Sequence, residues 1–387
     1  MFLLPFLLVF VLAGGDSCDP DSKNCEIDSN LSKFQIYHDA FAEAQEKYKY
    51  LVVENDRHTN CSIYSDQITL DLEPFKKAGI TKELFAKAQP KAVHYQIVNG
   101  KLYRQEKCMF GPRCEGVEHF LRKVAKSLPD VEFVLNDRDY PLSYTSNPLP
   151  IFSFSKTASH ADILYPAWSF WAGGPAISLH PRGIGRWDLM RKQLHGKAME
   201  TPWSRKESKG FFRGSRTSAD RDPLVLLSRK KPQLIDAQYT KNQAYKSEKD
   251  TLYATPASEV HFAEHCRYKY LFNFRGVAAS FRLRHLFLCK SLVFHVGQEW
   301  TEFFYSALKP WIHYVPVENS LQDVEDLLAF AKENDEIASK IARNGFEFIW
   351  NHLKQDDIVC YWKMLLTEYA KLLRYAVELD AALLAID

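Results

Sequence analysis

The chain has 387 residues, of which 46% are hydrophobic, 14% aromatic and 25% charged. This length is too great for one small core and predicts about two domains of ordinary size. The formal net charge is only +2, which argues against a general affinity for nucleic acid or anionic membranes. Any function of the basic residues must therefore be local.

The chain begins with an apolar run, "MFLLPFLLVFVLAGGDS". Its apolar core of about a dozen residues suits a signal peptide better than a membrane span, although the charged segment that usually precedes such a core is missing. We therefore predict a signal peptide over residues 1–17 and no membrane span. The mature chain is expected in the secretory pathway.

The number of cysteines is consistent with the secretory pathway. The sequence contains eight, an even number that fits an oxidising environment. No two of them have the C-x-x-C spacing typical of structural zinc. Cys108 and Cys114 flank the short loop "CMFGPRC", for which a local disulfide is expected. Glycosylation sequons at Asn30 and Asn60 agree with exposure to the lumen.

The first half of the chain predicts helices followed by strands. Residues 26–90 have apolar positions mainly at helical spacing. The next segments predict a hairpin with Asn-Gly at its turn ("AVHYQIVNGKLYRQ"), a helix ("GVEHFLRKVAKSL") and two strands ("VEFVLNDRDYP" and "LPIFSFSK"). Residues 157–205 are irregular and rich in Trp, Gly and Pro. Such loops more often contact a ligand or a partner than merely connect elements.

From near residue 205 strands alternate with helices. Strands are predicted in "KGFFRGS", "LIDAQYT", "YKYLFNFRG", "SLVFHV" and "WIHYVPV", and helices in "DPLVLLSRK", "VAASFRLRHLFLC" and the segment that follows the last strand. This alternation predicts a parallel sheet with helices on both faces. Two facing α/β units would form a cleft, and open parallel sheets bind ligands beyond the carboxyl ends of their strands.

Two strand-to-helix corners of this second unit repeat Phe-Arg-Gly, in "FRGSRTSADRD" and "FRGVAASFR". Gly214 and Gly276 permit close backbone approach or positive φ, and the following helix presents free N–H groups. Both corners then carry further arginines, at Arg216, Arg221 and Arg282. Guanidinium forks beside a helix N-terminus form an anion site suited to a diphosphate.

The alternative is that these arginines pair with Asp220, Asp222 or surface carboxylates. The presence of two such corners in one α/β unit favours the phosphate interpretation. Arg284 lies further along the predicted helix and is interpreted as structural. Three histidines in apolar surroundings without ligand spacing are interpreted in the same way: His265, His285 and His295.

The predicted strand "VEFVLNDRDYP" ends in two carboxylates, Asp137 and Asp139. As an Asp-x-Asp pair they could hold a divalent metal that neutralises a sugar-nucleotide diphosphate. Alternatively, one Asp at the strand's end is a general base that deprotonates an incoming hydroxyl. In a third interpretation Asp139 only caps the turn before Pro141. The arginines at the corners already supply positive charge, which weakens the metal interpretation.

Two aromatic-rich loops could form a surface for an acceptor. They carry Met109 and Phe110 in one loop and Trp168, Phe170 and Trp171 in the other. Aromatic faces suit sugars and apolar peptide side chains. Packing of the same rings in the core is an equal alternative.

Motifs along most of the chain carry a family resemblance. In order, they are "NDRDYP", "FSFSKT", "YPAWSFWAGGPA", "GRWDL", "FRGSRTS", "DRDPL", "DAQYTKNQA", "YKYLFNFRGVAASFR" and "HLFLCKSLVFHVG". Together they resemble the protein O-glucosyltransferases of the Rumi type, over roughly residues 30–375.

The resemblance implies an α/β fold of two facing Rossmann-like domains, as in GT-B-type glycosyltransferases, with an N-terminal helical extension. It implies an inverting enzyme of the endoplasmic reticulum lumen that uses no cofactor and no metal. Such enzymes move glucose from UDP-glucose to the serine of C-x-S-x-P/A-C in folded EGF-like repeats, as on Notch-type receptors. The expected partners are these repeats, with no nucleic acid and no membrane, and the chain is expected to be a monomer.

Two alternatives to this function stay open. The first is the same fold with UDP-xylose as donor or with another acceptor. The second is a non-catalytic binder or chaperone of EGF-like domains, against which the intact Asp139 and the intact arginine corners argue.

The resemblance also assigns site residues. The catalytic base is the Asp of the Arg-Asp-Tyr-Pro motif, which is Asp139, whereas Asp137 lies outside that motif. Contacts to UDP-glucose are implied at Ser215, Arg221, Asp236, Ala237, Val277, Ala278, Ala279, Ser280, Phe281 and Arg282. Acceptor contacts are implied at Met109, Phe110, Gly111, Pro112 and Arg113, and in a second loop at Ala176, Ile177, Ser178, Leu179, His180, Pro181 and Arg182. That second loop is a residue shorter than in the family and differs in composition.

The resemblance further implies the disulfides Cys61–Cys360, Cys108–Cys114 and Cys266–Cys289, which leaves Cys18 and Cys25 as a candidate local pair. The C-terminal "ALLAID" lacks the Lys-Asp-Glu-Leu-like retention signal usual in the family. We expect an acceptor-binding domain over residues 26–204 and a UDP-sugar-binding Rossmann-like domain over 205–350. Residues 351–387 are expected to form helices that pack back on the first domain.

Overall fold

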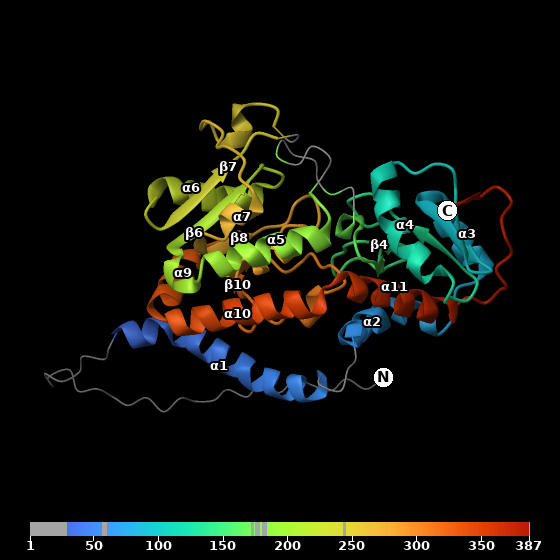
Figure 1. Ribbon diagram of the computed structural model, residues 1–387, viewed down its shortest axis with the longest axis horizontal. Coiled ribbons are helices and arrows are strands. Elements are labelled where there is room, and N and C mark those ends of the chain that lie inside the picture. The colour runs from blue at the N-terminus through green and yellow to red at the C-terminus, as the bar shows by residue number, and fades with distance from the viewer. Residues whose placement is uncertain are drawn as a thin grey trace, which may run out of the picture.

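The computed structural model describes residues 29–55, 60–171, 174, 179, 184–242 and 245–386. The predicted signal peptide, Cys18 and Cys25 lie outside these residues. Within these residues the fold contains two β-sheets, each packed against helices. Figure 1 shows the second sheet on the left, the strands and helices of the first unit on the right, and helices α10 and α11 running end to end beneath them.

The first sheet is mixed, with the strand order β11-β2-β1-β3-β4-β5. Its strands are β1 (Val93–Val98), β2 (Lys101–Arg104), β3 (Val131–Leu135), β4 (Ile151–Ser153), β5 (Ile163–Leu164) and β11 (Leu384–Ala385). The hairpin between β1 and β2 turns at Asn99 and Gly100, both with positive φ, which confirms the predicted Asn-Gly turn. Strands β3, β4 and β5 are parallel.

The second sheet is wholly parallel, with the order β10-β9-β8-β6-β7. Its strands are β6 (Glu207–Gly214), β7 (Ile235–Tyr239), β8 (Tyr268–Asn273), β9 (Leu292–Val296) and β10 (Val315–Val317). Residues alternate between its faces because side chains of a strand have a period of two. Phe211 and Leu271 therefore enter the core shared with the first sheet, whereas Phe212 and Phe272 enter a separate outer core.

The helices cover both sheets. They are α1 (Ser29–Asn55), α2 (Ser65–Lys76), α3 (Lys82–Ala88), α4 (Gly111–Ala125), α5 (Trp187–Glu200), α6 (Asp222–Lys230), α7 (Phe262–His265), α8 (Leu283–Phe287), α9 (Val324–Glu333), α10 (Asp335–His352) and α11 (Gln355–Ala370). The long α1 closes the outer core, where Phe34 and Tyr37 lie against Phe330 of α9. None of the helices among the described residues is long and apolar enough to cross a bilayer.

Helices α10 and α11 connect the two sheets. Helix α10 packs beside β9, and α11 packs on α4 and α2 of the first unit. The last carbonyl groups of α10 have no partner within the helix. Side chains of α5 satisfy them: Trp187 Nε1 donates to the Leu353 carbonyl at 2.6 Å, and Arg191 Nη2 donates to the Trp350 carbonyl at 2.6 Å. The division of the chain into domains at residues 204 and 350 stays a prediction.

The structure contains the three disulfides that the resemblance implies. They join Cys61 to Cys360, Cys108 to Cys114, and Cys266 to Cys289. The first ties the 3₁₀ helix η1 (Asn60–Tyr64) to α11, across 299 residues of sequence. Asn30 lies in α1 and Asn60 begins η1, and glycosylation at either residue stays a prediction.

Candidate active site

The two Phe-Arg-Gly corners lie side by side, because β6 and β8 are neighbours in the parallel sheet. Arg221 connects them. Its Nη1 donates to the Ser215 carbonyl at 2.6 Å, in the corner after β6, and its Nη2 donates to the Arg275 carbonyl at 2.5 Å, in the corner after β8. Each corner is therefore shaped by an arginine that spans both.

Arg282 makes the reciprocal connection. It follows β8 and donates from Nη1 to the Arg213 carbonyl of β6 at 2.7 Å. A Cβ atom on Gly214 would lie only 2.7 Å from Nη2 of Arg282 and 3.2 Å from Cζ of Phe212. Gly214 is therefore needed for close approach, as the sequence indicates, since any side chain there would displace the guanidinium.

Both bridging arginines retain unused hydrogen-bonding capacity. The Nε atoms of Arg221 and Arg282 are buried and have no hydrogen-bond partner among the described residues. Burial lowers the pKa of Arg282 to about 9, with a further contribution from Arg221, and burial lowers the pKa of Arg221 to about 10. The charge of Arg221 thus disfavours the charged form of Arg282, and an anion placed beside the two guanidinium groups would favour the charged form.

Two other arginines of the corners pair with carboxylates. Arg216 forms a bidentate ion pair with Asp222 at 2.8 and 2.6 Å, and this hydrogen bonding raises its pKa. Arg275 pairs with Asp220 at 2.7 Å. For these two side chains the alternative interpretation is correct, so the positive charge of the site rests on Arg221 and Arg282.

The helix predicted after β8 is much shorter than expected. The sequence predicts it across "VAASFRLRHLFLC", but α8 begins only at Leu283 and ends at Phe287. The chain turns before it, where the N–H of Gly276 donates to the Ala278 carbonyl. An array of free helix N–H groups beside the second corner, part of the predicted diphosphate site, is therefore not supported, because α8 has only five residues.

The structure groups most of the predicted donor residues at these corners. Ser215, Ala278 and Ala279 are buried, Ser280 and Phe281 are half-buried, and Val277 is 51% exposed. Asp236 and Ala237 lie further back, within β7. Asp236 forms an ion pair at 2.8 Å with Arg213, the arginine of the first Phe-Arg-Gly corner. Asp236 and Ala237 also line a cavity of about 430 Å³, with Lys209, Arg229 and Tyr239 among its other walls.

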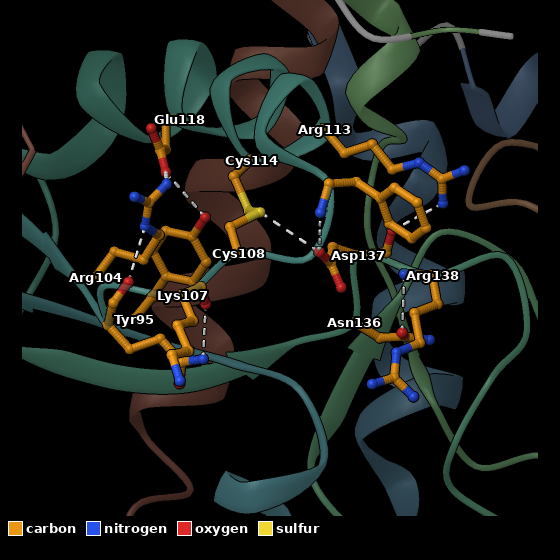
Figure 2. Close-up of a disulfide and its surroundings, with 12 residues drawn as sticks. Tyr95, Arg104, Lys107, Cys108, Arg113, Cys114, Glu118, Asn136, Asp137 and Arg138 are labelled. Carbon is orange, nitrogen blue, oxygen red and sulfur yellow. Dashed lines mark hydrogen bonds and ion pairs between the residues drawn. A yellow bond between two sulfur atoms is a disulfide. The ribbon is translucent and has the colours of Figure 1, made fainter.

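Asp137 and Asp139 follow β3 in the first unit, and their side chains have different environments. Figure 2 shows the Asp137 carboxylate between the Cys108–Cys114 disulfide and Arg113. Asp137 is buried and accepts a hydrogen bond from the Phe110 N–H at 3.0 Å. The Asp139 side chain is 44% exposed and forms an ion pair with Nη1 of Arg113 at 3.1 Å. Asp139 is thus the carboxylate available to a substrate.

Arg113 orients this corner. The same Nη1 atom that contacts Asp139 also donates to the Asp137 carbonyl at 2.8 Å. The guanidinium lies between the rings of Phe110 and Trp168, at 4.2 and 4.3 Å from their centroids. Aromatic faces on both sides fix the plane of a guanidinium group. Arg113 therefore holds Asp139 from a rigid position.

The turn before Pro141 is closed by a residue that the sequence interpretation missed. Asn136 Nδ2 donates to the Tyr140 carbonyl at 2.7 Å, and Asn136 Oδ1 accepts from the Arg138 N–H at 3.0 Å. Asn136 therefore shapes the turn, a role that one interpretation gave to Asp139. An Asn directly after a strand is itself a turn signal, which could have identified it.

Among the described residues, one group of side chains has the spacing of a metal site: Cys108, Cys114 and Asp137. The two sulfur atoms are joined in a disulfide, so neither can supply a thiolate ligand. The approach of 3.4 Å between Cys108 Sγ and Asp137 is a packing contact, because a disulfide sulfur carries no proton. This group does not fit a metal ion.

The aromatic residues of the two loops divide between surface and core. Met109 and Phe110 are 60% and 41% exposed, beside Asp137 and Arg113, and Gly111 and Pro112 are exposed with them. Trp168 and Phe170 are buried, whereas Trp171 is half-buried and stacks on His119. The exposed loop is therefore the candidate acceptor surface.

The second predicted acceptor loop is described at one residue, Leu179, whose N–H donates to Glu259 at 3.2 Å. The other residues predicted there lie outside the described residues: Ala176, Ile177, Ser178, His180, Pro181 and Arg182.

The three histidines interpreted as structural are buried in the second unit. Burial lowers the pKa of His265 to about 3 and that of His295 to about 4. His285 stacks on Phe262 with ring centroids 4.7 Å apart. Burial therefore favours the neutral form of His265 and His295, and the ring of His285 is packed.

Aromatic contacts link the Asp139 corner to the arginine corners. The Trp168 ring, which supports Arg113, meets the edge of Phe281 at 5.6 Å between centroids. Phe281 directly precedes Arg282. Tyr140, the residue after Asp139, meets Trp300, which follows β9 of the second sheet, at 5.3 Å between ring centroids. The candidate base and the candidate anion site thus belong to different sheets but share packed neighbours.

Comparison with known proteins identifies the family of the chain. The family model described as "Glycosyl transferase family 90" matches residues 56–387. "O-glucosyltransferase rumi" of Drosophila pseudoobscura pseudoobscura is 56% identical over 334 residues, which is 85% of this chain and 82% of that protein. "Protein O-glucosyltransferase 1" of Homo sapiens is 52% identical over 377 residues, 96% of this chain and 93% of that protein. A solved structure, Anabaena HepE in complex with UDP and glucose, matches 46% of this chain and 51% of its own chain, with 10% identity and a low TM-score of 0.32.

Proposed function

Because the chain belongs to glycosyl transferase family 90 and is closely similar to proteins named O-glucosyltransferases, we propose that it transfers glucose from UDP-glucose to protein. The proposed acceptor is the serine of C-x-S-x-P/A-C in folded EGF-like repeats of the Notch type. The geometry that supports this proposal best is the half-exposed Asp139, held by Arg113, together with a pair of corners that Arg221 and Arg282 bridge and that share packed neighbours with Asp139.

The proposed reaction is a single displacement with inversion. The acceptor serine lies within hydrogen-bond reach of Asp139, which takes its proton as the serine oxygen attacks the anomeric carbon of glucose. A new carbon–oxygen bond forms on one face of the sugar while the bond to UDP breaks on the other. UDP leaves with the bonding electron pair.

The positive charge at the corners then has a defined role. As UDP leaves, negative charge grows on its diphosphate, and the guanidinium groups of the buried Arg221 and the half-buried Arg282 stabilise it. We assign these two guanidinium groups as the donors to the phosphate oxygens. These cations replace a divalent metal, so we propose metal-independent transfer.

The proposed setting is the lumen of the endoplasmic reticulum, where oxidising conditions maintain disulfides such as the three in this chain. A facing arrangement of two Rossmann-like units, as in GT-B-type enzymes, is part of the same proposal. It would place the acceptor loop of the first unit opposite the donor corners of the second.

The test is direct transfer. Purified protein is incubated with UDP-glucose and a folded EGF-like repeat, and the repeat is weighed by mass spectrometry, with UDP-xylose and an unfolded repeat as parallel arms. Addition of one hexose to the consensus serine supports the proposal. Transfer of pentose alone indicates a xylosyltransferase, and binding of the repeat without transfer indicates a non-catalytic binder. Loss of activity in EDTA that manganese restores would contradict the metal-free mechanism.

A further inference from the structure

Arg284 is a buried cation that the proposed mechanism leaves without a role. It lies in α8, two residues after Arg282, and is 1% exposed. Its Nη2 atom donates to the Ser169 carbonyl at 3.1 Å and to the Ser169 hydroxyl at 2.8 Å. Ser169 belongs to the 3₁₀ helix η3 (Trp168–Phe170), which packs on α4 of the first unit. The two hydrogen bonds therefore connect the donor corner to the acceptor side.

Burial of this guanidinium is costly and is only partly offset. Burial lowers the pKa of Arg284 to about 10, although the nearby Glu302 carboxylate raises it. The Nε and Nη1 atoms of Arg284 and Oε2 of Glu302 are buried without hydrogen-bond partners among the described residues. A buried charge with so few direct partners contributes little to stability compared with a well-packed apolar side chain. What it does provide is a fixed direction for two hydrogen bonds.

Aromatic rings fix that direction further. The Arg284 guanidinium lies 4.1 Å from the ring centroid of Phe170 and 5.3 Å from that of Trp187. Stacking holds the plane of a guanidinium group, so its N–H groups point along defined lines. The peptide of Ser169 is thereby held in one place relative to α8.

Ser169 is covalently next to Trp168, the ring that supports Arg113. Arg113 in turn contacts Asp139. A short series of contacts thus runs from α8, which begins directly after Arg282, to the candidate base. It consists of hydrogen bonds, a packed ring, the peptide bond between Trp168 and Ser169, and the ion pair between Arg113 and Asp139.

We propose that Arg284 and Ser169 are positioning residues for glucose transfer: their hydrogen bonds set the placement of the Asp139 corner relative to the arginine corners. The inference rests on the proposed function. Neither residue touches substrate in this scheme. Reaction rates fall steeply when reacting groups are displaced by about 1 Å, so loosening this connection lowers the rate of transfer and leaves donor binding unchanged.

The main test is Ser169→Ala, which removes one of the two acceptor atoms and creates little empty space. Ser155→Ala is the matched control, because Ser155 is also a buried serine of the first unit and its hydroxyl has no partner among the described residues. Three quantities are measured for each: kcat for transfer at saturating donor and acceptor, Kd for UDP by calorimetry, and the melting temperature. Arg284→Lys, which keeps the charge but not the planar fork, serves as the second variant.

We expect Ser169→Ala to lower kcat about tenfold relative to Ser155→Ala, with Kd for UDP and melting temperature equal in the two proteins. Arg284→Lys should lower kcat further, again without weakening UDP binding. Equal kcat values in the two serine variants would overturn the positioning role, and so would a loss of kcat matched by an equal loss of UDP affinity. Absence of glucose transfer by the unaltered protein would instead overturn the proposed function, so the two failures are distinguishable.

Discussion

Arg113 and Asp139 form an ion pair of 3.1 Å in which the same guanidinium nitrogen also donates to the backbone two residues earlier, at Asp137. The carboxylate is therefore held from one side and open on the other, with 44% of its side chain exposed. A general base needs this combination of fixed orientation and access to the substrate hydroxyl.

The first prediction concerns Asp139. Asp139→Asn keeps the size of the side chain but cannot take a proton, so we expect transfer to fall by about a thousandfold. Binding of UDP, measured by calorimetry, should be unchanged because the arginine corners are intact. Asp137→Asn is the control; it should retain far more activity, since Asp137 is buried and supports the Phe110 backbone. Comparable transfer by Asp139→Asn and the unaltered enzyme would refute the assignment.

The second prediction concerns the close approach at Gly214. In Gly214→Ala the new Cβ would lie 2.7 Å from Nη2 of Arg282, so the guanidinium must move. We expect the KM for UDP-glucose to rise about tenfold, since charge-assisted hydrogen bonds to phosphate depend on geometry. Gly196→Ala, at an exposed helical position with no atom within 4 Å of its new Cβ, is the matched control. An unchanged KM would indicate that Arg282 does not contact the donor.

The third prediction concerns the Cys108–Cys114 disulfide, which holds the loop that carries Met109, Phe110 and Arg113. Replacing both cysteines by serine should raise the KM for the EGF-like repeat several-fold, because the loop loses its constraint. The disulfide closes only a short loop, so its removal should lower the free energy of unfolding by only about 2 kcal/mol. Calorimetry with UDP checks that the donor site is unaffected. A weakened UDP affinity together with a normal acceptor KM would contradict the assignment of this loop.

The fourth prediction concerns pH. Burial raises the pKa of Glu302 from 4.5 to about 7, against the opposing charge of Arg284. The folded protein therefore binds this proton more tightly than the unfolded chain does, so the Glu302 contribution to stability is lost as pH rises from about 4.5 to about 7. Denaturant titrations of Glu302→Gln should show a smaller decline in unfolding free energy over this window than the unaltered protein shows. Parallel pH profiles in the two proteins would show that Glu302 does not titrate in this range.

Much of the fold could be predicted because local signals and tertiary packing agree. The Asn99–Gly100 turn needed positive φ at both residues, and the alternation after residue 205 indicated the parallel sheet. The order of strands in that sheet could not be predicted. Strand β6 pairs with β8, although β7 comes between them in the sequence. The crossed contacts of Arg221 and Arg282 depend on that pairing.

Residue type also left some roles undecided. Four arginines of the two corners look alike in sequence, yet Arg216 and Arg275 pair with carboxylates, while the Nε atoms of Arg221 and Arg282 have no partner among the described residues. The distinction depends on which groups the fold brings within reach of each guanidinium, which no local pattern encodes. The extent of α8 was wrong for a related reason: good helix formers precede Leu283, but the chain there turns back through the Gly276 and Ala278 contact.

The disulfide between Cys61 and Cys360 has a consequence for biosynthesis. The first unit contains α11 and β11 from the far end of the chain, so its packing is completed only after all strands of the second sheet have been made. During translation, Cys61 emerges with its native partner still 299 residues away, whereas Cys108 and Cys114 follow much sooner. Oxidative folding must therefore keep Cys61 reduced, or correct early mispairing, until the last helix arrives.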